Sequence, residues 1–130
     1  MKQTIYNQLT ERKRAGRKLF TVLIDPDKVD GTKIDQLVSL SVDAKVDYFF
    51  VGGSLITTTN LAQVVTTIKE NVTIPVVLFP GNSMQIDPSA DALLFLSLIS
   101  GRNPELLIGQ HVIAAPVSYT HLTLPTKRIV

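Results

Sequence analysis

Four short apolar runs recur along the chain, at residues 19–24, 48–51, 76–79 and 93–99. Each run is continuous rather than alternating and is rich in aromatic, branched or other large apolar residues, which is typical of strands buried on both faces of a parallel sheet. Parallel strands need a long crossover between them, usually a helix. The runs therefore predict an α/β fold in which helices separate the strands.

The segments between the first three runs have the spacing of crossover helices. Apolar residues recur there at helical intervals, at Ile34, Leu37, Val38 and Val42 and again at Leu61, Val64, Val65 and Ile68. Asn60, with Gln63 three residues later, predicts a start resembling a capping box for the second of these helices. A leading helix is expected around residues 5–14, and another is expected to begin at Pro104, after the capping residue Asn103.

The connection between the third and fourth strands is too short for a helix. Residues 80–88 contain three turn-forming residues at their start and have no amphipathic period. A missing outer helix would expose the flank of the sheet, where an apolar groove could hold a long hydrophobic substrate. A simple loop under a neighbouring helix is the alternative.

The pattern ends near residue 117. Residues 112–117 predict the opening of a fifth strand, whereas residues 118–130 have neither helical nor strand periodicity, and Pro125 interrupts any strand there. This last stretch also resembles translated sequencing-adapter read-through. We therefore expect a partial domain over residues 1–117, an artefactual and unstructured tail over residues 118–130, and a natural gene that continues differently.

The composition fits one globular domain. The 130 residues are 45% apolar and 18% charged, and the net charge of +2 is too small to indicate a nucleic-acid partner. Basic residues crowd positions 12–18, but no aromatic residues alternate with them as in a base-stacking platform, so we interpret them as a solvated helix end.

The chain has no cysteine, no apolar signal segment at residues 1–9 and no run approaching the ~20 apolar residues of a membrane helix. We expect a cytoplasmic protein without an integral membrane segment.

Polar clusters follow the first two strands. Asp25 and Asp27 flank Pro26, and if the strand geometry continues, both carboxylates lie on one side, where one could hold Mg²⁺. An ordinary turn is the equal alternative. In the Gly-Gly-Ser turn after the second strand, Gly53 allows a phosphate to approach the backbone and the Ser54 hydroxyl can ligate Mg²⁺, whereas a tight bend is the alternative. Since the carboxyl ends of parallel strands share one edge, these clusters predict a site for a metal ion and phosphate.

Asn82 and Arg102 follow the third and fourth strands and are further candidates at this edge. An arginine can contact a diphosphate through two parallel hydrogen bonds, and surface exposure is the alternative for both residues. His111 lies in an apolar stretch and is interpreted as structural, and His121 falls in the tail. The sequence contains no catalytic triad pattern, no cysteine or histidine cluster for zinc and no dinucleotide-binding fingerprint.

Four motifs together resemble geranylgeranylglyceryl phosphate synthase and its bacterial heptaprenyl relatives. They are TVLIDPDK at 21–28, DYFFVGGS at 47–54, PVVLFPGN at 75–82 and ADALLFLSLISGRNP at 90–104, and their order and spacing make the signal specific. The likeness runs over residues 1–117. It implies a modified TIM barrel in which a short extended segment replaces the third outer helix. This chain is therefore expected to form the N-terminal half of such a (β/α)8 barrel.

The resemblance also implies a Mg²⁺-dependent prenyltransferase. Such enzymes join a polyprenyl diphosphate, geranylgeranyl or longer, to the sn-3 hydroxyl of sn-glycerol 1-phosphate, which makes an ether-lipid precursor. Asp25 and Ser54 match the metal-binding positions, Gly53 is expected to leave room for the phosphate, and Asn82 and Arg102 are candidate substrate contacts. The lipid chain is expected to lie beside the shortened connection.

The glycine-rich segments that hold glycerol phosphate in the family do not occur in this sequence. No catalytic residue is therefore assigned, and the isolated chain is expected to be inactive, with open sheet edges that favour aggregation or self-association. Full-length relatives are expected to be homo-oligomers.

Two alternatives to an enzyme fit the same residues. One is a non-catalytic half-barrel that binds phosphate or self-associates. The other is a phosphate-accepting receiver domain, which the acidic pair after the first strand suggests. A receiver would need a further aspartate after the third strand, where Phe79-Pro80-Gly81 stands instead.

Overall fold

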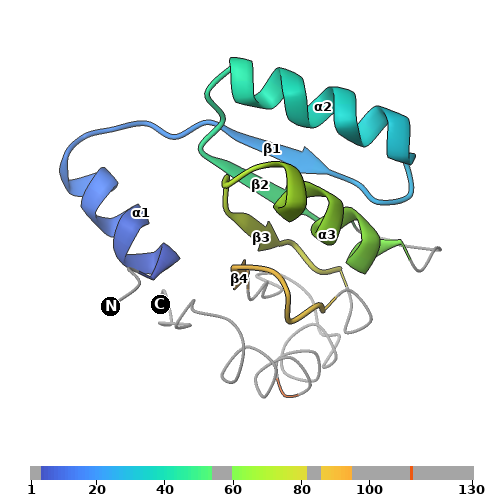
Figure 1. Cartoon of the computed structure of the whole chain (residues 1–130). Helices are drawn as coiled ribbons and strands as arrows, with labels where there is room; N and C mark the ends of the chain where they lie inside the picture. The colour runs from blue at the N-terminus through green and yellow to red at the C-terminus, as the bar shows by residue number, and fades with distance from the viewer. Residues whose placement is uncertain (1–3, 54–59, 82–85, 95–111, 113–130) are drawn as a thin grey trace.

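The apolar runs form a four-stranded parallel sheet in the computed structural model, which describes residues 4–53, 60–81, 86–94 and 112. The strand order is β1-β2-β3-β4, so each strand lies beside its neighbour in the sequence, and every pairing is parallel. Figure 1 shows this progressive order. The strands are β1 (Thr21–Ile24), β2 (Tyr48–Val51), β3 (Val76–Leu78) and β4 (Ala92–Leu93).

Three helices occur in this part of the chain: α1 (Ile5–Arg14), α2 (Gly31–Asp43) and α3 (Leu61–Asn71). The first two begin with side-chain caps, because Thr4 and Asp30 are extended and accept hydrogen bonds from backbone amides three residues later. Asn60 precedes α3, but its side chain makes no capping hydrogen bond, so the expected capping box is wrong. The cause is its backbone, which is already helical at φ −80° and ψ −2°.

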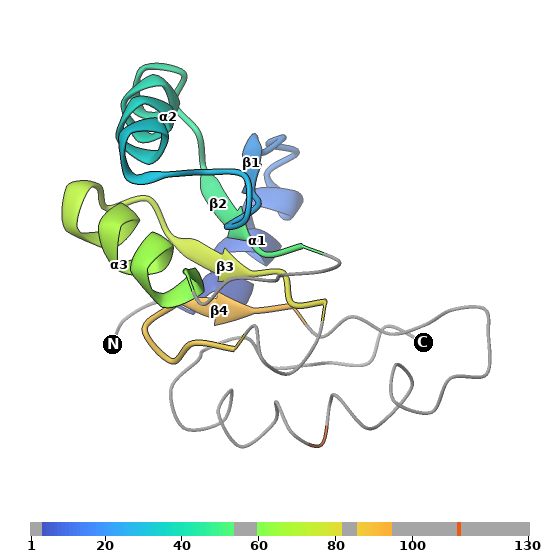
Figure 2. The same ribbon diagram turned by 90° about the vertical axis from the view of Figure 1, so that its right-hand side faces the viewer.

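The sheet separates two apolar clusters. On one face α2 and α3 pack against the strands through a large cluster that includes Ile24, Phe49, Val51, Val76, Leu78 and Leu93 from the sheet and Val38, Val65 and Ile68 from the helices. On the other face, Ile5 of α1 packs against Tyr48 of β2, Val77 of β3 and Ala92 of β4. Figure 2 shows α1 on the opposite side of the sheet from α2 and α3.

Strand β1 departs from the prediction of burial on both faces. Leu23 is 58% exposed, and Phe20, just before the strand, is 54% exposed. Within the described ranges β1 pairs with β2 alone and forms the edge of the sheet, and α1 packs against β2, β3 and β4.

The connection from β3 to β4 has no helix in its described parts, residues 79–81 and 86–91, as predicted. The expected helix from Pro104, most of the predicted strand at 112–117 and the tail at 118–130 lie outside the described residues. Val112 is helical and exposed, so the prediction that a strand begins there is wrong. A short apolar run cannot be assigned to strand or helix by periodicity alone.

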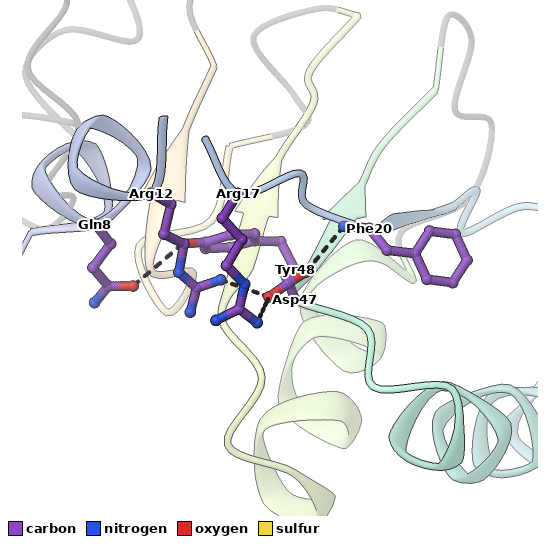
Figure 3. A network of polar contacts seen from close by, with 6 residues as sticks. All are labelled: Gln8, Arg12, Arg17, Phe20, Asp47 and Tyr48. Carbon is purple, nitrogen blue, oxygen red and sulfur yellow. Dashed lines mark hydrogen bonds and ion pairs between the residues drawn. The ribbon is translucent and has the colours of Figure 1, made fainter. Parts of the chain in front are cut away.

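A carboxylate ties α1 to the amino-terminal edge of the sheet. Asp47, just before β2, accepts hydrogen bonds from Arg12 through Oδ1 at 2.6 Å and from the Phe20 amide through Oδ2 at 3.0 Å. Arg17 lies 3.4 Å from Oδ1. The carboxyl side chain is only 11% exposed. Figure 3 shows both arginines directed at Asp47, and Arg12 also lies over the Tyr48 ring at 5.7 Å.

This network shifts the pKa values of two groups. The hydrogen bond from the Phe20 amide, with help from Arg12, lowers the pKa of Asp47. Burial raises the pKa of Tyr48, whose hydroxyl donates to Gln8 at 3.3 Å. The interpretation of the basic segment as a solvated helix end holds for Lys13, Arg14, Arg17 and Lys18, which are exposed. Arg12 departs from it, because its side chain is only 32% exposed and contacts Asp47 at 2.6 Å.

Asp91 repeats the arrangement at the start of β4. Its amide donates to the Val76 carbonyl at 2.9 Å, and its Oδ2 accepts from the Val76 amide at 2.9 Å. The Asp47 amide likewise donates to the Phe20 carbonyl at 2.8 Å. Lys69 of α3 pairs with Asp91 Oδ1 at 2.8 Å. In both places, an aspartate one residue before a strand accepts a hydrogen bond from a backbone amide near the start of the preceding strand. The same carboxylate forms an ion pair with a helix.

Candidate functional site

The chain turns directly after β1, and the turn fixes the carboxylate of Asp25. The Lys28 amide donates to the Asp25 carbonyl at 3.0 Å, and the Asp27 amide donates to Asp25 Oδ1 at 3.1 Å. The strand therefore ends at Ile24, and the expectation that both carboxylates follow a continued strand is not met. The turn holds Asp25 at the carboxyl edge of the sheet through its own backbone.

The glycine turn after β2 lies against that carboxylate. The Gly52 amide donates to the Ile24 carbonyl at 3.0 Å, which continues the parallel ladder one residue past the end of β2. A Cβ added to Gly53 would lie 3.4 Å from both Cγ and Oδ1 of Asp25. Asp25 and the residue before Ser54 are therefore in close proximity, as the shared edge of parallel strands predicts.

Gly52 serves a different purpose from Gly53. Its φ is +151°, and a Cβ there would lie 2.0 Å from the Phe79 carbonyl oxygen, so no other residue fits. The Phe79 amide in turn donates to the Val51 carbonyl at 2.8 Å. Gly52 thus allows β3 to approach β2 at the point where both strands end, whereas a Cβ at Gly53 would make only ordinary van der Waals contacts with Asp25.

Lys28 is a cationic partner of Asp25. Its Nζ lies 3.2 Å from Asp25 Oδ2, and the two side chains are 80% and 25% exposed. The spacing of three residues across the turn brings the ammonium to Asp25.

The Asp25 carboxylate fits the way in which Mg²⁺ commonly binds to proteins. Within the described ranges, no group of three histidine, cysteine, aspartate or glutamate residues could hold a metal ion. Mg²⁺ commonly binds through one or two carboxylates and completes its shell with water and substrate phosphate. A single, partly exposed carboxylate beside a glycine turn fits that mode, and Asp25 supplies it.

The other predicted site residues, Ser54, Asn82 and Arg102, lie outside the described residues, as does His111. Their assigned roles stay predictions, as do the roles of Asp25 and Gly53. The described helices include none that is long and apolar enough to cross a membrane.

Comparison with known proteins agrees with the resemblance seen in the sequence. The chain matches the PcrB family over residues 7–124. It is 56% identical over 116 residues to the geranylgeranylglyceryl phosphate synthase of Chitinophaga pinensis, covering 89% of this chain and 46% of that protein. It is 53% identical over 109 residues to the synthase of the same name from Spirosoma linguale, covering 84% of this chain and 44% of that one. The chain spans about half the length of these curated relatives.

Solved structures show the same partial coverage. The (S)-3-O-geranylgeranylglyceryl phosphate synthase of Thermoplasma acidophilum, in complex with its substrate sn-glycerol-1-phosphate, superposes with a TM-score of 0.82 at 29% identity. The match covers 92% of this chain and 49% of that one. Wild-type GGGPS from Thermoplasma volcanium gives a TM-score of 0.77 at 32% identity, covering 88% and 46%.

These matches confirm the predicted fold class, an α/β half-barrel corresponding to about half of each enzyme chain. They do not test the metal ion, the compartment or the oligomeric state, which stay predictions. The extent of the family match, 7–124, includes almost all of the described residues. The chain belongs to the PcrB family.

Proposed function

We propose that this chain forms the metal and diphosphate side of a prenyltransferase that joins a polyprenyl diphosphate to sn-glycerol 1-phosphate. In this reaction the bond between prenyl C1 and the diphosphate oxygen breaks, and a bond forms between C1 and the sn-3 oxygen. The hydroxyl proton is released, and diphosphate leaves with the electron pair of the broken bond. The product is an ether.

The proposed role of the carboxyl edge is to hold the leaving group. Asp25 and Ser54 would bind Mg²⁺, which when present neutralises negative charge on the departing diphosphate. Gly53 would leave the phosphate oxygens room beside Asp25, and Asn82 and Arg102 would contact substrate. The prenyl chain would extend along the flank beside the β3–β4 connection, which lacks a helix in its described parts.

One observation carries the proposal: the Asp25 carboxylate lies against Gly53, directly before Ser54, at the carboxyl edge of two adjacent parallel strands. In barrels of this kind, ligands bind at that edge. The relative from Thermoplasma acidophilum was solved with sn-glycerol-1-phosphate, and this supports that molecule as the acceptor. The glycerol phosphate itself would be held by segments that this sequence does not contain.

A chimera tests the proposal. Residues 1–117 of this chain replace the matching segment of the Chitinophaga pinensis relative, and ether formation is measured with geranylgeranyl diphosphate and sn-glycerol 1-phosphate. We expect a working chimera in which Asp25→Asn lowers kcat/KM by about 100-fold or more, since it removes charge at the metal. Asp35→Asn, an exposed aspartate on α2, is the matched control and should leave the rate unchanged.

Two further variants refine the assignment. Ser54→Ala should also lower kcat/KM, because it removes a proposed ligand of the metal ion. Gly53→Ala should lower the rate while the far-ultraviolet spectrum stays unchanged, because the added methyl makes only ordinary contacts with Asp25. Full activity of Asp25→Asn would contradict the proposal. Turnover at a normal rate by the 130-residue chain alone would contradict our expectation that it is inactive by itself.

A non-catalytic, self-associating half-barrel is the second candidate. The exposure of Phe20 and Leu23 on the edge strand favours it, because an apolar sheet edge is a template for pairing with another chain. The two candidates predict different results for the chimera. If the half-barrel has no catalytic role, Asp25→Asn should leave the rate of ether formation unchanged.

A further inference from the structure

The Asp25 carboxylate already has a cationic partner. Oδ2 faces the Lys28 ammonium at 3.2 Å, while Oδ1 accepts the Asp27 amide at 3.1 Å. A divalent ion that binds Asp25 therefore meets a carboxylate with both oxygens in use. The Oδ1 contact is to the backbone of the turn, whereas the Oδ2 contact is to a flexible side chain that is 80% exposed.

This asymmetry decides which contact can give way. The Oδ1 bond is part of the turn that begins at Asp25, so breaking it would leave the Asp27 amide without this acceptor. Moving the ammonium needs only rotations in the lysine side chain, and water is available to solvate it. Oδ2 is therefore the oxygen that an incoming cation can reach at low cost.

We propose that Lys28 is a positioning residue that competes with the metal ion for Asp25 and makes metal binding depend on the anionic substrate. This inference rests on the metal site of the proposed function. Without an anion, the ammonium occupies Oδ2 and would repel a divalent ion beside it. With a phosphate group bound beside Asp25, as the proposed function requires, the displaced ammonium would gain an anionic partner.

The consequence is a coupling between the two ligands. An anion that attracts the ammonium frees Oδ2 for the metal, and by linkage the metal frees the ammonium for the anion. Because Lys28 is exposed, its ion pair with Asp25 should weaken metal binding only modestly. Removing the charge of Lys28 should therefore tighten metal binding about two- to fivefold. The apparent metal affinity of the resting protein is thus set lower than that of the protein with diphosphate bound.

The chain contains a matched pair that serves as the control. Lys33 lies 3.1 Å from Asp30 with the same spacing of three residues, and both side chains are more than half exposed. Asp30 caps α2 and has no place in the proposed site. Lys33→Met therefore removes an equivalent charge from an equivalent ion pair away from Asp25.

The experiment measures Mn²⁺ binding to the 130-residue chain at low ionic strength, from the paramagnetic resonance signal of free Mn²⁺. We expect Lys28→Met to bind Mn²⁺ about two- to fivefold more tightly than the unaltered chain. Lys28→Arg should restore the original affinity, and Lys33→Met should not change it. Addition of inorganic phosphate should tighten Mn²⁺ binding more in the unaltered chain than in Lys28→Met.

Two results would overturn the inference and leave the proposed function intact: Lys28→Met binds Mn²⁺ no more tightly than the unaltered chain, or Lys33→Met gives the same gain. Asp25→Asn separates the remaining case. If Asp25→Asn binds Mn²⁺ as well as the unaltered chain, the metal is held elsewhere, and the proposed site fails together with the competition at Lys28. Circular dichroism verifies that each variant is folded.

Discussion

Asp47→Asn is the sharpest test of how α1 is fixed to the sheet, because it removes a charge and keeps the shape. The asparagine oxygen can still accept the Phe20 amide, whose present distance is 3.0 Å. The charged contact with Arg12 at 2.6 Å is lost. Hydrogen bonds to charged groups contribute about 1.5–3 kcal/mol when buried. Arg12 is 32% exposed and regains water, so we expect a loss of about 1–2 kcal/mol in the free energy of unfolding.

The pH dependence has a definite sign. The pKa of Asp47 is lowered by folding, chiefly through the Phe20 amide, so its contribution to stability is fully present above the pKa of the unfolded chain, about 4. That contribution is lost as the pH falls through the lower pKa of the folded state. The difference between the unaltered chain and Asp47→Asn should therefore be constant near neutral pH and shrink below about pH 4.

Urea unfolding followed by circular dichroism gives the free energies, with Asp35→Asn on the exposed side of α2 as the control. A double-mutant cycle with Arg12→Met separates the pair from the rest of the network. The reasoning is refuted if Asp47→Asn costs no more than Asp35→Asn at neutral pH. It is also refuted if the cost is unchanged where Asp47 is protonated in both states.

Three more substitutions test the sheet. Asp91→Asn should cost less than Asp47→Asn, about 0.5–1 kcal/mol in urea unfolding, because its ion pair is about one-third exposed; an equal cost would contradict this. Gly52→Ala should cost about 3 kcal/mol or more or prevent folding, since its Cβ would meet the Phe79 carbonyl, whereas Gly31→Ala in open space should be neutral or stabilising. Leu23→Ser should reduce self-association in light scattering with less than about 0.5 kcal/mol change in stability; unchanged scattering would exclude this flank as the contact.

The elements that depend on continuous local patterns could be predicted from the sequence. The strand at 48–51 and the helix at 5–14 have the predicted bounds, because apolar runs and helical spacing are encoded over a few neighbouring residues. The proximity of Asp25 to the glycine turn also followed from a general property of parallel sheets. Both predictions required only local pattern and strand direction.

Contacts between distant segments could not be predicted in this way. Arg12 and Asp47 are 35 residues apart, and nothing in the spacing of the basic residues indicates which acid they meet. The exposure of Leu23 depends on the position of β1 at the sheet edge, which an apolar run does not reveal. The sequence also left two interpretations of the Asp-Pro-Asp segment open, a turn and a metal site, because both use the same residue types.

Three aspartates at strand ends show how position decides what a carboxylate can do. At the amino edge, Asp47 and Asp91 give their oxygens to a backbone amide and to cations of a packed helix, so neither oxygen is released without loosening the fold. At the carboxyl edge, Asp25 gives one oxygen to its own turn and the other to an exposed lysine. That last contact fixes no helix to the sheet, so it can be exchanged for a ligand at little cost to the fold. The same division between a stabilising edge and a ligand-binding edge is expected of a (β/α)8 barrel, and in this chain it is already present in four strands.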